Sequence, residues 1–113
     1  MKTTNDPVEK YTYRVIWSEE DQEHVGLCAE FPSLSWLDRS QEGALRGIVD
    51  VVRTAVRVMM RARESLPEPL AMRRYSGQFK VRIPPEVHRR LSMEASESKV
   101  SLNRLVSAKL AHG

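Results

Sequence analysis

The chain has 113 residues, of which 41% are hydrophobic and 29% charged, values that are ordinary for a globular protein of one or two small domains. No apolar run approaches the length of a membrane span, and the first residues lack the hydrophobic core of a signal peptide, so we expect a cytoplasmic protein without membrane contact. The single cysteine, Cys28, excludes an internal disulfide. No Cys/His spacing is typical of a metal site, and we expect no cofactor.

Charge is distributed unevenly along the chain. The net charge is +3, but residues 1–69 carry 9 Lys+Arg against 12 Asp+Glu, whereas residues 70–113 carry 9 Lys+Arg against 3 Glu. An acidic front and a basic back indicate two partners of opposite charge. A chance fluctuation in a short chain would give the same counts.

The first third of the chain has the pattern of a small antiparallel sheet. Residues 11–17 are rich in aromatic and β-branched side chains, and a short polar connection leads to a second apolar run at residues 25–31, which favours a hairpin. Pro32 ends the second strand, and residues 34–38 indicate a short third one. One face of the second strand is expected to carry Val25, Leu27, Ala29 and Phe31.

A long helix follows, with Ser40 as its expected N-cap and an end near Glu64. Apolar residues recur at three- and four-residue steps and predict a core-facing stripe of Leu45, Ile48, Val49, Val52, Val56 and Met59. A second row on this helix is basic and is either solvated or a nucleic-acid contact: Arg53, Arg57 and Arg61.

The segment "SLPEPLAMRR" contains two prolines and no periodicity, so it predicts a linker. After it, residues 78–83 alternate strictly between polar and apolar and predict a strand. A helix is expected from Pro85, burying Val87, Leu91 and Ala95, and a last helix is expected with Ser101 as its N-cap and with Leu102, Leu105, Val106 and Leu110 inward.

One strand and two helices in fewer than forty residues cannot bury enough surface to fold alone. Two copies solve this, because their strands pair antiparallel across a two-fold axis and the four helices cover the apolar face of Phe79, Val81 and Ile83. The sequence therefore predicts a homodimer through this module.

The opposite face of the paired strands presents Gln78, Lys80 and Arg82 from each copy, and a two-stranded ribbon fits the DNA major groove. Arg and Lys can donate to guanine, and Gln can pair with adenine, so these residues are expected to contact bases. The N-terminus of the last helix is expected to contact a phosphate through Ser101, Leu102 and Asn103. The alternative is an ordinary edge strand with a solvated polar face.

Across residues 76–111, "GQFKVRIPPEVHRRL" and "KVSLNRLV" resemble the ribbon-helix-helix repressors of the Arc/MetJ type. The resemblance implies an obligate dimer that binds operator DNA through the strand residues. One departure is visible. The turn between the helices often uses glycine for a left-handed residue, whereas Ser98-Lys99 stands here, and a lysine in that conformation costs about 1 kcal/mol.

The strand order, the stretch "VGLCAEFPSLSW" and the long helix resemble the HicB antitoxin family, so that both resemblances together cover residues 11–111. They imply an α+β fold: a small antiparallel sheet with one covering helix, similar to part of an RNase H fold, plus a ribbon-helix-helix dimerisation module. The domains expected are 1–66, a linker at 67–75, and 76–113. A glycine usual in the family is replaced by Ser35-Trp36.

By this resemblance the protein is an antitoxin of a type II toxin-antitoxin pair. It would neutralise a small basic HicA-like toxin that cleaves mRNA, and repress its own operon. The alternatives are a free-standing ribbon-helix-helix transcription regulator whose N-terminal module binds a ligand or a protein, and an RNA-binding or RNA-cleaving protein.

A nuclease site of the RNase H type would need three or four clustered carboxylates, and only Glu30, Asp38 and Asp50 are candidates. We therefore expect that the protein has no catalytic residue and is not an enzyme.

The three histidines lie in polar stretches of the sequence, without the spacing of a nucleophile or a metal-ligand set, and are expected at the surface: His24, His88 and His112.

Overall fold

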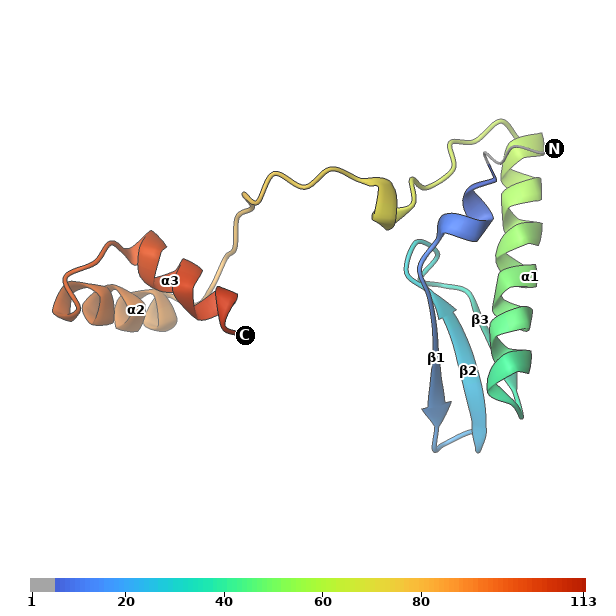
Figure 1. Cartoon of the computed structure of the whole chain (residues 1–113), viewed down its shortest axis with the longest axis horizontal. Coiled ribbons are helices and arrows are strands. Elements are labelled where there is room, and N and C mark those ends of the chain that lie inside the picture. Colours follow the sequence, from blue (N-terminus) through green and yellow to red (C-terminus); the bar gives the residue numbers. More distant parts are fainter. Residues whose placement is uncertain (1–5) are drawn as a thin grey trace. The chain divides into compact units, whose positions relative to one another are not determined.

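A computed structural model describes residues 6–113. The chain divides into two compact units, one ending at Tyr75 and the other spanning Ser76–Gly113 (Figure 1). The first unit combines a three-stranded antiparallel sheet with one long helix, and the second contains two helices. This confirms the expected α+β class and the sheet with one covering helix.

The sheet has the order β1-β2-β3 and consists of β1 (Tyr13–Ser18), β2 (Glu23–Cys28) and β3 (Ser35–Asp38). The predicted hairpin and the short third strand are confirmed, since both neighbouring pairs are antiparallel. The second strand ends three residues earlier than predicted. The amide of Phe31 donates to the Cys28 carbonyl at 3.1 Å, which turns the chain before Pro32 is reached.

Helix α1 (Gln41–Arg61) covers one face of this sheet (Figure 1). It begins as predicted at Ser40, whose hydroxyl accepts a hydrogen bond from the Gly43 amide at 2.9 Å. The stripe of buried residues runs at four-residue steps through Ala44, Ile48, Val52 and Val56. The prediction that Leu45 faces inward was wrong. Its side chain is 45% exposed, and Ala44 occupies the tight position against the sheet instead.

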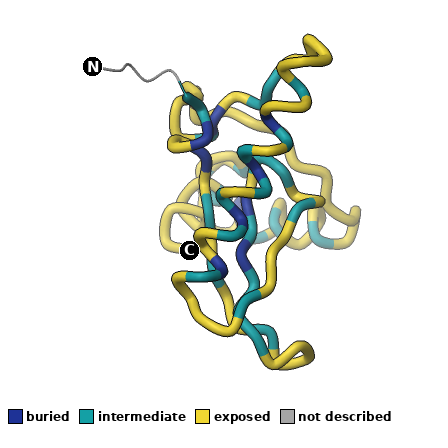
Figure 2. The backbone as a smooth tube through the Cα atoms, turned by 90° about the vertical axis from the view of Figure 1, so that its right-hand side faces the viewer, coloured by how far each residue is buried: buried dark blue, intermediate teal, exposed yellow. Residues whose placement is uncertain are grey.

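The core lies between α1, the sheet and a short 3-10 helix η1 (Pro7–Lys10), and it consists of Val8, Tyr11, Cys28, Ile48, Val52 and Val56. Figure 2 colours the buried positions of the chain dark blue. Gly26 touches the helix directly, so the even-numbered residues of β2 face α1. Val25 and Leu27 therefore share the opposite face. Phe31 does not continue that set as predicted, because it lies beyond the strand and packs against the core.

The first part of the proline-rich segment after α1 is hydrogen-bonded to the α+β unit. The Tyr11 hydroxyl donates to the Pro67 carbonyl at 2.9 Å, and the Leu70 amide donates to Glu30 Oε2 at 2.8 Å. Pro69 is buried, and a single turn of 3-10 helix, η2 (Leu70–Met72), follows.

The second unit contains α2 (Pro85–Glu97) and α3 (Leu102–Ala111), which begin where the sequence predicts. Residues 78–83 were predicted to form a strand, but they are irregular in the single chain. A strand needs a neighbouring strand as its hydrogen-bonding partner, and no described strand lies beside these residues. Within Ser76–Gly113 the one buried residue is Ala95. The buried core of this unit, in the single chain, is therefore very small.

Candidate functional site

The residues predicted to contact bases lie in the irregular segment directly before α2. Gln78, Lys80 and Arg82 are all exposed, and so are the apolar residues that alternate with them: the exposed fraction is 75% for Phe79 and 63% for Val81. Large apolar side chains this exposed mark an interaction surface. The structure thus leaves both sets available to partners, and the base contacts stay a prediction.

The residues predicted to contact a phosphate form the first turn of α3. The Ser101 hydroxyl accepts a hydrogen bond from the Arg104 amide at 3.0 Å, which confirms Ser101 as the N-cap. The amides of Leu102 and Asn103 lie in the first turn, where a helix has no internal acceptors for its N–H groups. This end of α3 has the geometry that suits an anion. The phosphate contact itself stays a prediction.

The turn between the two helices keeps a left-handed residue although it contains no glycine, since Lys99 has a φ of 59°. The amides of Lys99 and Val100 donate to the carbonyls of Ser96 and Ala95, at 3.1 and 3.0 Å. This is the double closure of a Schellman motif, which satisfies the last carbonyls of α2. Lysine therefore adopts the turn that glycine usually makes.

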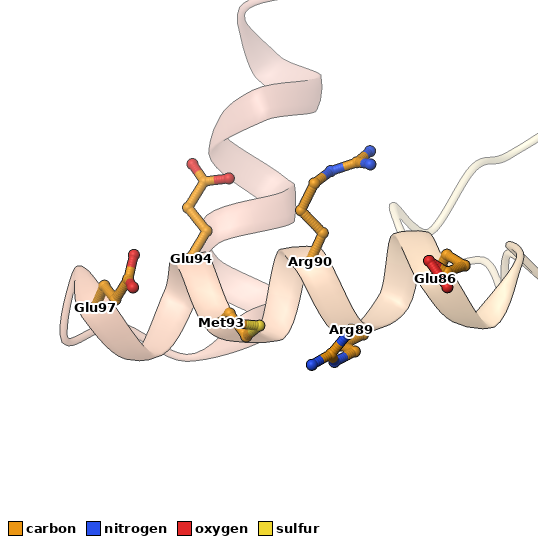
Figure 3. Close-up of a pocket in the computed structure, with 6 residues that line it drawn as sticks. All are labelled: Glu86, Arg89, Arg90, Met93, Glu94 and Glu97. Atoms are coloured by element: carbon orange, nitrogen blue, oxygen red, sulfur yellow. The ribbon is translucent and has the colours of Figure 1, made fainter.

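A surface depression of about 410 Å³ runs along α2 (Figure 3) and is lined by Glu86, Arg89, Arg90, Met93, Glu94 and Glu97. Arg89 and Arg90 lie between carboxylates on either side, and Glu94 is paired with Lys109 at 3.2 Å. The mixed charge gives the depression no preference for an anionic or a cationic ligand.

The face of the sheet that α1 does not cover is apolar at its centre. Ile16, Val25 and Leu37 lie side by side in register across the three strands. The neighbouring row consists of Arg14, Leu27 and Ser35, and the row toward the hairpin tip ends in Ser18 and Glu23. We call Ile16, Val25, Leu27 and Leu37 the open-face patch.

The carboxylates considered for catalysis are dispersed. Glu30 accepts hydrogen bonds from the amides of Thr12 and Leu70, at 2.9 and 2.8 Å. Partial burial alone would raise the pKa of Glu30, but these hydrogen bonds outweigh it and the pKa is lowered. Asp38 accepts from the Ser40 amide at 3.0 Å, and this bond lowers its pKa. Within residues 6–113 no three His, Cys, Asp or Glu side chains gather as a metal site would require.

Other sequence candidates also have local roles. Cys28 is buried in the core, and burial raises the pKa of its thiol, which is the environment of an inert packing cysteine. Arg53 is paired with Asp6 at 3.2 Å, whereas Arg57 and Arg61 are exposed. Sequence reasoning missed the structural role of Glu30, because nothing local to "AEFP" indicates a partner forty residues away.

Comparison with known proteins gives one result. A family model described as the HicB family matches residues 62–110. The match supports a HicB-family protein, and it covers less than half of the chain, from the residue after α1 almost to the end of α3. The three-stranded sheet lies outside it. No curated protein and no solved structure shows significant similarity to the chain.

In the described part of the chain, no helix has the length and apolarity to cross a membrane.

Proposed function

We propose that this protein is an antitoxin that neutralises a HicA-like mRNA-cleaving toxin and represses its own operon. The observation that carries the proposal is the HicB family match over residues 62–110. That family relationship supports a role in a toxin-antitoxin pair. The split of the chain into two compact units supports a division of labour between two partners.

The second unit is proposed to be a ribbon-helix-helix dimer that holds operator DNA. Phe79, Val81 and Ile83 are exposed in the single chain, and a second copy would bury them beneath the four helices. The same pairing places Gln78, Lys80 and Arg82 of both copies on one ribbon, a shape that enters the major groove. The basic composition of residues 70–113 supports contact with the DNA backbone.

The α+β unit is proposed to bind the toxin and to have no catalytic activity of its own. Its carboxylates Glu30 and Asp38 are engaged by backbone amides, which favours a structural role over metal binding. Its acidic sheet would attract a basic protein and repel nucleic acid.

The first test is to look beside the gene for a small reading frame that encodes a basic protein, and to express that protein alone and together with this one. We expect growth arrest from the small protein alone and relief on co-expression. Absence of arrest, or arrest that co-expression does not relieve, would favour a free-standing transcription regulator. Operator binding by the purified protein would then distinguish that regulator from an RNA-binding protein.

A further inference from the structure

We propose that the open-face patch of the sheet, rather than helix α1, is the surface that binds the toxin. The inference rests on the proposed function and specifies where within the α+β unit the toxin docks. The occupant is a basic protein that places an apolar side chain on the patch and its cationic groups around the hairpin tip.

The geometry of the patch suits an apolar anchor. The register places Ile16, Val25 and Leu37 in one row, each directly opposite its neighbour on the adjacent strand. Ile16 and Leu37 are each 42% exposed, and Val25 between them is half-buried. Leu27, in the neighbouring row, extends the patch toward a hollow of about 340 Å³ that is also lined by Pro32 and Arg14. Such a connected apolar surface, open on one side, resembles the central part of a protein interface.

The acidic residues around the patch favour a basic partner. Between Tyr13 and Asp38 the chain carries six acidic residues and one basic residue, Arg14. Four of the acidic residues lie at the hairpin end of the sheet: Glu19, Glu20, Asp21 and Glu23. Two copies packed through this face would bring like charges together, whereas a basic partner would be attracted and steered. The patch is therefore assigned to the toxin and not to a second copy of this chain.

The helix layer of the unit offers exposed apolar residues too, but in the opposite electrostatic setting. Val58 and Met60 on α1 are 59% and 61% exposed. They lie among Arg57 and Arg61, and α1 carries four arginines against two acidic residues. A basic toxin is disfavoured there, so this surface provides a matched control.

The experiment measures the affinity of the full chain for the toxin encoded by the neighbouring reading frame, by titration calorimetry at fixed salt. Ile16→Asp and Leu37→Asp should each weaken binding roughly thirty-fold, as expected for central interface residues. Met60→Asp should leave the affinity within about twofold. Operator binding and circular dichroism spectra should match the unaltered protein for all three variants.

A second variant separates loss of binding from loss of folding. Arg14→Glu makes the acidic sheet more acidic beside the patch, so affinity should rise about threefold at low salt and the gain should fade as salt increases. Misfolding cannot raise the affinity for the toxin.

The inference is overturned if Met60→Asp weakens toxin binding while Ile16→Asp and Leu37→Asp do not. It is also overturned if the two patch variants reduce the oligomer size in sedimentation but bind toxin normally, since the face would then join copies. Failure of the unaltered chain to bind the toxin would instead overturn the proposed function.

Discussion

The carboxylate of Glu30 accepts a hydrogen bond from the backbone amide of Leu70 at 2.8 Å, and so joins the end of the β2 strand to a residue forty positions later. Its other oxygen accepts from the Thr12 amide at 2.9 Å, beside the start of β1. The Tyr11 hydroxyl adds a second tie, to the Pro67 carbonyl. The proline-rich segment is thereby attached to the α+β unit as far as η2.

Glu30→Gln should loosen this attachment. The amide of glutamine presents one acceptor oxygen and one donor nitrogen, so it cannot accept from Thr12 and Leu70 at once. We expect a loss of about 1 to 2 kcal/mol in unfolding free energy, the scale of a hydrogen bond to a charged group. Hydrogen exchange at the Leu70 amide should accelerate at least about tenfold. Glu68→Gln is the control, because Glu68 is exposed and has only a 3.9 Å contact with Arg73. Unchanged exchange at Leu70 would contradict the prediction.

The same carboxylate predicts a pH dependence. The pKa of Glu30 is lowered from its usual value of 4.5, so the unfolded chain binds more protons at this residue than the native chain does. The stabilisation is fully present above the usual value and is lost as the pH falls through the lowered one. Denaturant titrations between pH 7 and pH 3 should show the gap between wild type and Glu30→Gln closing, and a constant gap would contradict this assignment.

Lys99→Gly should stabilise the second unit. Lys99 has a φ of 59°, a conformation that costs a side-chain-bearing residue about 1 kcal/mol and costs glycine almost nothing. Slower hydrogen exchange along α2, measured at fixed protein concentration, would report the gain. The control is Ser98→Gly, since Ser98 has a φ of −87° and glycine relieves no strain there. An equal gain in both variants would show that strain at Lys99 is not its source.

Gly26→Ala should destabilise the first unit, because the helix lies directly on this glycine. An added Cβ would meet the Ala44 carbonyl and lie 2.8 Å from Ile48 Cγ2, both in the first two turns of α1. Overpacking of this kind typically costs about 1–3 kcal/mol. Chemical denaturation should show the loss, and Ser35→Ala, at an exposed position of β3, should show little change. A neutral Gly26→Ala would mean that α1 can move away from the sheet.

Local signals predicted the elements of the fold well. Ser40 and Ser101 begin their helices with the side-chain caps that their positions indicate, and Pro85 opens α2. The choice between neighbouring apolar residues was harder to predict. Leu45 is more hydrophobic than Ala44, but the close approach at Gly26 leaves room only for the smaller side chain. That outcome depends on the distance between layers, which no periodicity encodes.

Features that depend on distant residues or on a second molecule were the least predictable. Alternation placed Val25 and Leu27 on one face, but only the contacts of Gly26 with α1 show that this face is the open one. The alternation at residues 78–83 predicted a strand, and a strand needs a partner that a single chain does not contain. In both cases the sequence pattern is local, whereas the structure depends on what lies opposite.

Arg82→Ala tests the proposed DNA interface most directly. If the ribbon enters the major groove, Arg82 donates to a guanine edge, and its loss should weaken operator binding by about 1–3 kcal/mol. The weakening should be confined to operators that keep that base pair, and binding to unrelated DNA should change little. Fluorescence anisotropy with a panel of single-base operator variants measures both effects. Arg57→Ala, an exposed arginine on α1, is the control and should leave all affinities unchanged. The contrary outcome is that Arg82→Ala weakens the binding of every DNA sequence equally and reduces the slope of log affinity against log salt concentration by about one. In that case Arg82 contacts a phosphate, and the register of the ribbon differs from the one proposed.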